Sequence, residues 1–130
     1  MKNYLISLLF FIATVAGAGD PFNTRVQLAK SIENSADGQS FQKIFWDSAG
    51  DYTASVMQQC FPKSTKPDTT AFTLVANLIP RGALANVEVR PQTKQSLCFA
   101  RGFRKASFPE PPENFGNEGM PLVIEMKITP

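Results

Sequence analysis

Apolar and polar residues alternate with a period of two in three stretches of the C-terminal half of the chain, a spacing typical of a β-strand with one buried face. The stretches are residues 71–79, 83–90 and 122–128. The side chains expected on the buried faces are Phe72, Leu74, Ala76 and Leu78, then Ala85, Val87 and Val89, then Leu122, Ile124, Met126 and Ile128. The pattern therefore predicts three strands.

A tight reversal is expected between the first two strands, at Pro80-Arg81-Gly82. Proline fixes its own φ and glycine accepts a positive φ, so this sequence favours a hairpin turn. Pro91 lacks a backbone donor and is expected to end the second strand.

Helical spacing is found before and after this hairpin. Asp51 is a suitable N-cap for a helix ending before Pro62, and this helix places Tyr52, Val56, Met57 and Cys60 on one face. Thr93 is a suitable N-cap for a second helix, which carries Cys98 and runs through Phe103. Gly102 weakens that helix by up to about 1 kcal/mol relative to alanine, which indicates close approach to a neighbour.

The segment between residues 19 and 50 has a weaker pattern. Residues 21–35 fit either a marginal helix or a flexible arm, and Ser35-Ala36-Asp37-Gly38 forms a polar break. The aromatic cluster at Phe41, Phe45 and Trp46 fits core or capping residues better than a ligand site.

The order of the strands follows from their connections. A helix between the second and third strands favours parallel alignment of those two strands, and a right-handed crossover places the first strand between them. We therefore expect an α+β fold, with a three-stranded antiparallel sheet in the order 2-1-3 and the helices packed on one face. The last strand is then a free edge, made of Leu122, Val123, Ile124, Glu125, Met126, Lys127 and Ile128.

The N-terminus has the pattern of an export signal. Lys2 precedes an apolar run over residues 4–15, and Ala16-Gly17-Ala18 resembles a cleavage site. The run is shorter than the roughly 20 residues of a membrane-spanning helix, although retention as an inner-membrane anchor is the alternative. The expected organisation is a signal peptide at 1–18, a partly helical lead segment at 19–50 and one domain at 51–130.

Composition narrows the range of functions. Lys and Arg number 13 against 11 Asp and Glu, which does not indicate a nucleic-acid partner. The cluster of Arg101, Arg104 and Lys105 fits a solvated end of a helix. The chain has no histidine, which excludes Ser-His-Asp and Cys-His catalysis and removes the commonest zinc ligand. We therefore expect no enzyme activity, cofactor, metal or small-molecule substrate.

Cys60 and Cys98 are the two cysteines of the chain. In an exported protein an even number of cysteines favours a structural disulfide, and only one intramolecular pairing exists. Closing a loop of about 40 residues stabilises by roughly 4 kcal/mol in the chain-entropy model.

Together these features resemble the C-terminal domain shared by TonB and TolA. The resemblance covers roughly residues 51–130 and rests on the alternating first strand, the turn at Gly82, the sequence Phe108-Pro109-Glu110-Pro111-Pro112 after the second helix, and the last strand. Cys98 early in that helix, with a partner N-terminal to it, is closer to the TolA side, whose domain carries a disulfide.

The resemblance implies a periplasmic interaction domain of the cell envelope that docks a periplasmic or outer-membrane protein by adding a partner strand to the last strand. Homodimers by edge pairing are a further possibility. TonB and TolA have a membrane anchor and a long spacer, whereas about 30 residues separate the signal from the domain here. A short anchored energy transducer in transport is the first alternative, and an enzyme inhibitor working through residues 41–46 is the second.

Overall fold

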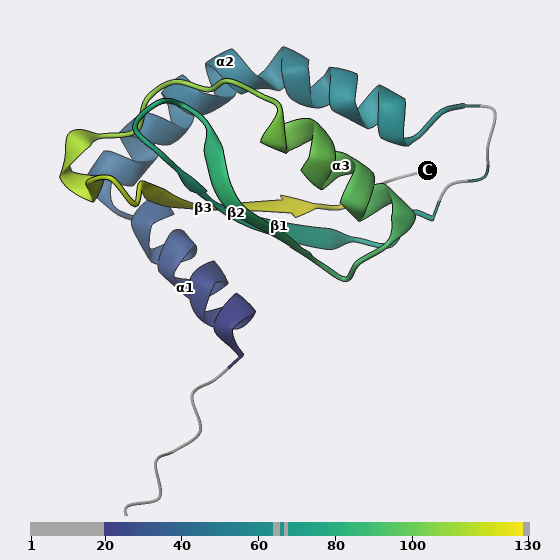
Figure 1. The fold of residues 1–130 in the computed structure, drawn as a ribbon, viewed down its shortest axis with the longest axis horizontal. Coiled ribbons are helices and arrows are strands. Elements are labelled where there is room, and N and C mark those ends of the chain that lie inside the picture. The colour runs from purple at the N-terminus through teal and green to yellow at the C-terminus, as the bar shows by residue number, and fades with distance from the viewer. Residues whose placement is uncertain (1–19, 64–65, 67, 129–130) are drawn as a thin grey trace, which may run out of the picture.

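The computed structural model describes residues 20–63, 66 and 68–128. Its elements, in chain order, are α1 (Pro21–Glu33), α2 (Ala36–Cys60), β1 (Phe72–Leu78), β2 (Leu84–Arg90), α3 (Lys94–Arg104), a short 3-10 helix η1 (Glu113–Phe115) and β3 (Met120–Met126). Figure 1 shows α2 and α3 lying along one side of the sheet and α1 on the opposite side. The expected signal peptide lies outside the described residues, and no described helix is long and apolar enough to span a membrane.

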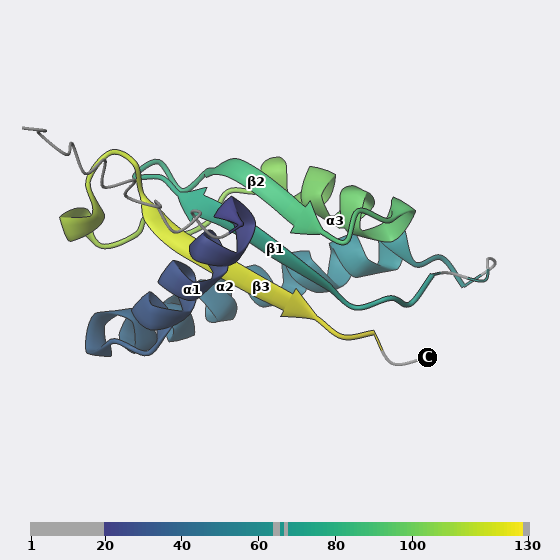
Figure 2. The same cartoon turned by 90° about the horizontal axis from the view of Figure 1, so that it is seen from below.

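The three strands form one antiparallel sheet in the order β2-β1-β3, as the sequence predicts. Leu74 pairs with Val89 on one side and with Ile124 on the other, so β1 is the central strand (Figure 2). The α+β class and the strand order are confirmed. The third strand begins two residues earlier than expected, at Met120, and ends at Met126.

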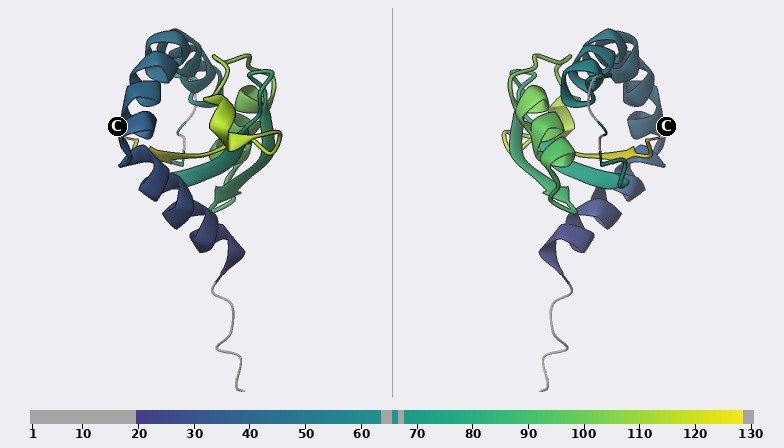
Figure 3. Two further views of the ribbon diagram at one scale, coloured as in Figure 1. Left: turned by 90° about the vertical axis from the view of Figure 1, so that its left-hand side faces the viewer. Right: turned by 90° about the vertical axis from the view of Figure 1, so that its right-hand side faces the viewer.

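The sheet is covered on both faces (Figure 3). The face predicted to be buried packs against α2 and α3 and forms the main core, in which Leu74, Leu78, Phe99 and Phe103 are fully buried. The expectation that the helices pack on one face holds for α2 and α3. It is wrong for α1, which covers the opposite face through a second cluster made of Phe22, Val26, Ala29, Val75 and Val123.

The lead segment belongs to the folded unit. Ser35 caps α2 by accepting a hydrogen bond from the N–H of Gly38, and the helix then continues without interruption to Cys60. The boundary expected between residues 50 and 51 therefore falls inside a helix, and Asp51 is not an N-cap. Phe41 and Phe45, one turn apart, are both buried in the main core, because a continuous helix brings them onto the face that also carries Val56 and Cys60.

A β-bulge changes the expected pattern of β2. Val75 pairs with Glu88 and Asn77 with Ala85, so Asn86 and Val87 together lie opposite one residue of β1. Asn86 has φ +53°, a left-handed conformation that asparagine tolerates better than most residues. The extra residue moves Leu84 onto the main core in place of Ala85, so the prediction for Ala85 is wrong, while that for Val89 is confirmed.

Gly82 forms the hairpin turn, as expected. Its φ is +80°, and its carbonyl accepts a hydrogen bond of 2.8 Å from the N–H of Phe108. A Cβ at Gly82 would lie 2.1 Å from the Phe108 carbonyl oxygen, so the turn needs glycine for its conformation and for the space. This contact fixes the segment after α3 against the hairpin.

Candidate functional site

The outer edge of β3 is the predicted docking site, and the structure divides it into two parts. Leu122, Val123 and Ile124 are buried, with 4%, 6% and 4% of their surfaces exposed. These fractions count whole residues, so their main-chain groups are covered together with their side chains. Glu125 and Lys127 are exposed, and Met126 and Ile128 are half-buried. Only the second part of the predicted edge is open to a partner.

The first part is enclosed by the α1–α2 hairpin, which we define as α1, the turn at residues 34–35 and the first turns of α2. α1 crosses one face of the sheet, α2 returns on the other, and the connection between them lies on the β3 side (Figure 3). Ile32, near the end of α1, packs against the main core. The hairpin thus closes around the middle of β3.

A charged cluster lies where α1, α2 and β3 meet. Lys30 Nζ of α1 lies 2.8 Å from Glu125 Oε1 of β3. Burial raises the pKa of Glu33, and the negative charge of Glu125 raises it further. A hydrogen bond with Gln42 and the positive charge of Lys30 act in the opposite direction. The two carboxylates thus share one lysine beside the edge of β3.

The other edge of the sheet, β2, is protected by its bulge and by two arginines. Arg25 of α1 donates to the carbonyl of Asn86 at 2.7 Å and also lies 3.6 Å from Glu88. Arg104 of α3 donates to the carbonyl of Val87 at 3.1 Å. The two arginines come from helices on opposite faces of the sheet and occupy carbonyls of neighbouring residues. A bulge together with bound carbonyls is an effective protection against strand pairing.

The disulfide between Cys60 and Cys98 is present, with the two Cα atoms 5.7 Å apart. It joins the last residue of α2 to the first half of α3, as the sequence predicts. Gly102 lies one turn further along α3, and a Cβ there would lie 2.7 Å from Val56 Cγ1 of α2. The expectation that Gly102 allows a close approach is therefore confirmed.

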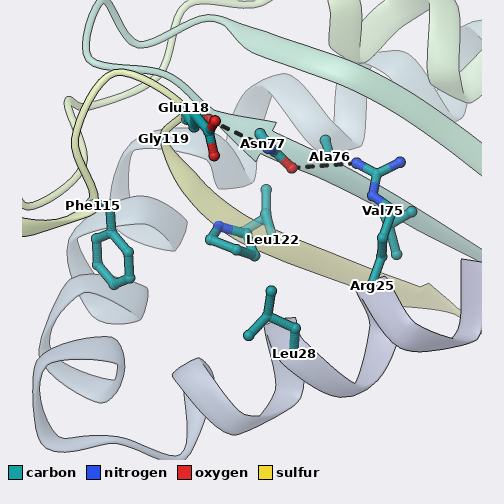
Figure 4. Close-up of a pocket in the computed structure, with 10 residues that line it drawn as sticks. Arg25, Leu28, Val75, Ala76, Asn77, Phe115, Glu118, Gly119 and Leu122 are labelled. Carbon is teal, nitrogen blue, oxygen red and sulfur yellow. Dashed lines mark hydrogen bonds between the residues drawn. The ribbon is translucent and has the colours of Figure 1, made fainter. Parts of the chain in front are cut away.

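A hollow of about 210 Å³ lies between α1 and the segment that leads into β3. Figure 4 shows Leu28, Phe115 and Leu122 around it, with Asn77 accepting a hydrogen bond from Arg25 and donating one to the Glu118 carbonyl. The amide of Asn77 is thus occupied on both sides. The hollow is smaller than the roughly 300–1,000 Å³ of typical small-molecule sites.

The other candidates from the sequence do not form a reactive site. Phe41 and Phe45 belong to the core, whereas Trp46 is 38% exposed and packs edge-on against Phe45. This arrangement fits the core and capping role that the sequence indicates. Within residues 20–63, 66 and 68–128, no three His, Cys, Asp or Glu side chains are grouped so that they could hold a metal ion.

Sequence reasoning missed the α1–α2 hairpin and the arginines on β2. Val26, Ala29 and Ile32 give residues 21–35 a loose helical spacing, and Asp20 followed by Pro21 fits the N-cap and first position of α1. Nothing local indicates which face of a sheet such a helix covers. Comparisons with protein-family models, curated proteins and solved structures find no match.

Proposed function

We propose that the protein is an exported protein-interaction module that docks an extended segment of a partner protein along residues 125–128, which are the last two residues of β3 and the two that follow it. The observation that carries this proposal is the division of the β3 edge. The α1–α2 hairpin encloses residues 122–124, whereas residues 125–128 extend beyond the hairpin and are more exposed. Strand addition takes its affinity from main-chain hydrogen bonds and its selectivity from alternate side chains.

The pairing of the sheet supports this position. The ladder between β1 and β3 ends at the pair Phe72 and Met126, and Lys127 and Ile128 follow it. The β2 edge is occupied at Asn86 and Val87 by arginine side chains. Of the two edges of the sheet, the end of β3 is thus the one at which a partner strand would displace the fewest existing contacts.

Two further features support an envelope location. The disulfide between Cys60 and Cys98 fits a protein that folds in an oxidising compartment. The apolar run at residues 4–15 followed by Ala16-Gly17-Ala18 fits export. A periplasmic or outer-membrane protein is the partner that these features and the resemblance to TonB and TolA domains favour.

The proposal is tested by site-specific photocrosslinking in the periplasm, with the photoreactive residue at Lys127. Lys43 of α2 is the matched control, because it is also an exposed lysine and lies outside the proposed docking residues 125–128. Val123 is unsuitable because its side chain is buried under α1. We expect one protein to be captured from position 127 and not from position 43, and to be identified by mass spectrometry.

Binding of the purified captured protein is then measured with two variants. Lys127→Pro removes a backbone donor beyond the β1 ladder, so it should reduce affinity at least tenfold while the fold is kept. Lys127→Gln, which keeps the donor, should bind within about twofold of the parent. Equal binding by both variants, capture from neither position, or capture of only a second copy of this chain contradicts the proposal.

A further inference from the structure

A positively charged cavity, which plays no part in the proposed strand docking, lies on the side of the sheet that carries α2 and α3. A cavity of about 240 Å³ lies between the C-terminal end of α2 and the first half of α3. The described residues that line it are Gln59, Cys60, Pro62, Lys94, Gln95, Cys98 and Arg101. We call it the anion pocket. Of these seven described residues two are cationic, two carry primary amides and none is acidic.

The two cations are available for a ligand. Lys94 and Arg101 are seven residues apart, so they lie on the same side of α3 two turns from each other. Their side chains form no ion pair or hydrogen bond within the described part of the chain, unlike Arg25, Lys30 and Arg90. No Asp or Glu occurs between Glu88 and Glu110, so α3 has no acidic residue of its own to neutralise them.

The amide of Gln95 adds an unpaired polar group. Its Oε1 is buried and accepts no hydrogen bond from the described residues. Such an atom is costly unless a ligand or water satisfies it. Rotation of the amide by half a turn would place Nε2 in the same position as a donor, because the two ends of a glutamine amide have the same shape.

The floor of the pocket is held in place by covalent structure. Cys60 and Cys98 are joined there, which fixes the end of α2 against α3. Lys94, Gln95 and Arg101 are therefore carried by one helix whose position relative to Gln59 cannot drift freely. A fixed arrangement of cations and amides reduces the entropy lost when an anion binds.

We propose that the anion pocket binds a carboxylate, as presented by an acidic side chain of a protein ligand. Arginine and lysine bind carboxylates through charge-assisted hydrogen bonds, and arginine can do so with two parallel bonds. The exposed amide of Gln59 supplies a further donor, and the amide of Gln95 does so after the rotation described above. The disulfide with Pro62 offers apolar surface for the methylene groups of a glutamate. The pocket and the end of β3 share no residue, so this inference stands independently of the proposed docking at β3.

The test is an NMR titration of the ¹⁵N-labelled oxidised protein with N-acetylglutamate at constant ionic strength. N-acetylglutamine is the neutral control, and inorganic phosphate is a second anion. We expect saturable shifts of the Gln59, Gln95, Cys98 and Arg101 amides with N-acetylglutamate, and at least fivefold weaker binding of both other probes. Absence of saturation, or equal binding of the neutral analogue or of phosphate, overturns the proposal.

Variants locate the binding. Arg101→Gln combined with Lys94→Gln should weaken N-acetylglutamate binding at least tenfold, because both cations of the pocket are lost. Lys105→Gln and Lys43→Gln together remove the same charge from exposed sites outside the pocket and should leave binding within about twofold. Both double variants change exposed side chains that form no hydrogen bond with another described residue, and their dispersed amide spectra verify the fold. Similar loss in both double variants would identify non-specific attraction and contradict a pocket.

Discussion

Two glycines illustrate how one residue type has opposite effects in two helices. Gly50 lies in the middle of α2, and a Cβ built there meets nothing within 4 Å. Gly102 lies in α3, where a Cβ would come within 3 Å of both Val56 γ-carbons. Glycine in the interior of a helix costs about 1 kcal/mol relative to alanine, so only the neighbour decides whether substitution helps.

We expect Gly50→Ala to raise the free energy of unfolding by about 0.5–1 kcal/mol, through helix propensity alone. Gly102→Ala gains the same propensity, but overpacking against Val56 costs about 1–3 kcal/mol, so a net loss is expected. Urea denaturation at equilibrium measures both variants. The loss of stability caused by Gly102→Ala should be smaller in a Val56→Ala background than in the parent, because the smaller side chain at position 56 leaves room for the added Cβ. A stabilised Gly102→Ala protein would show that α2 and α3 are not packed this closely.

At the scale of single elements, the predictions from sequence succeed where the signal is local. Phe72, Leu74, Ala76 and Leu78 are all buried as the period of two requires, and Gly82 forms the turn. The pattern misplaces Ala85 because a bulge at Asn86 shifts the alternation by one residue. Such a bulge depends on the partner strand, so a linear pattern does not reveal it.

The candidate site could be predicted only in part for a similar reason. The sequence places β3 at an edge, and the structure confirms that position. The enclosure of residues 122–124 depends on α1, whose buried residues Phe22, Val26 and Ala29 pack against Val75 and Val123. The apolar spacing of such a helix indicates that one of its faces is buried, but it does not identify the residues that bury it. Here these residues are Val75 and Val123, which are distant in the chain.

The junction of α1, α2 and β3 should respond to pH through Glu33. Burial and the charge of Glu125 raise the Glu33 pKa above 4.5, so the folded state binds the proton more tightly than the unfolded state does. Unfolding free energy therefore falls as pH rises from 4.5 through the raised pKa, and the full penalty is present above it. Glu33→Gln removes the penalty and keeps a group that can bond Gln42.

Glu33→Gln should accordingly be more stable than the parent at pH 7, and the difference should disappear below pH 4.5. Thermal unfolding across that range measures it. Glu118→Gln is the control, because Glu118 is exposed and has no ion pair within the described part of the chain. A Glu33→Gln protein that is less stable at pH 7 would mean that the ionised carboxylate supports the junction through Lys30.

At the scale of the whole molecule, the lead segment is part of the fold because it supplies buried residues to both faces of the sheet. α1 supplies Phe22, Val26 and Ala29 to one face, and the first half of α2 supplies Phe41 and Phe45 to the other. A TonB- or TolA-like unit limited to residues 51–130 would leave Val75 and Val123 uncovered and would remove two phenylalanines from the main core. The segment expected to lead into the domain thus completes it.

We therefore expect a fragment of residues 51–130 to lack a fixed tertiary structure, whereas a fragment of residues 19–130 folds. Loss of a single buried phenylalanine side chain typically costs 3–5 kcal/mol, and a domain of this size has about 5–15 kcal/mol in total. Amide dispersion in NMR spectra of both oxidised fragments distinguishes the outcomes. Native-like dispersion of the short fragment would show that α1 and the first half of α2 are accessories. In that case α1 and the first half of α2 could be removed without unfolding the rest of the domain. The full length of the β3 edge would then become available to a partner.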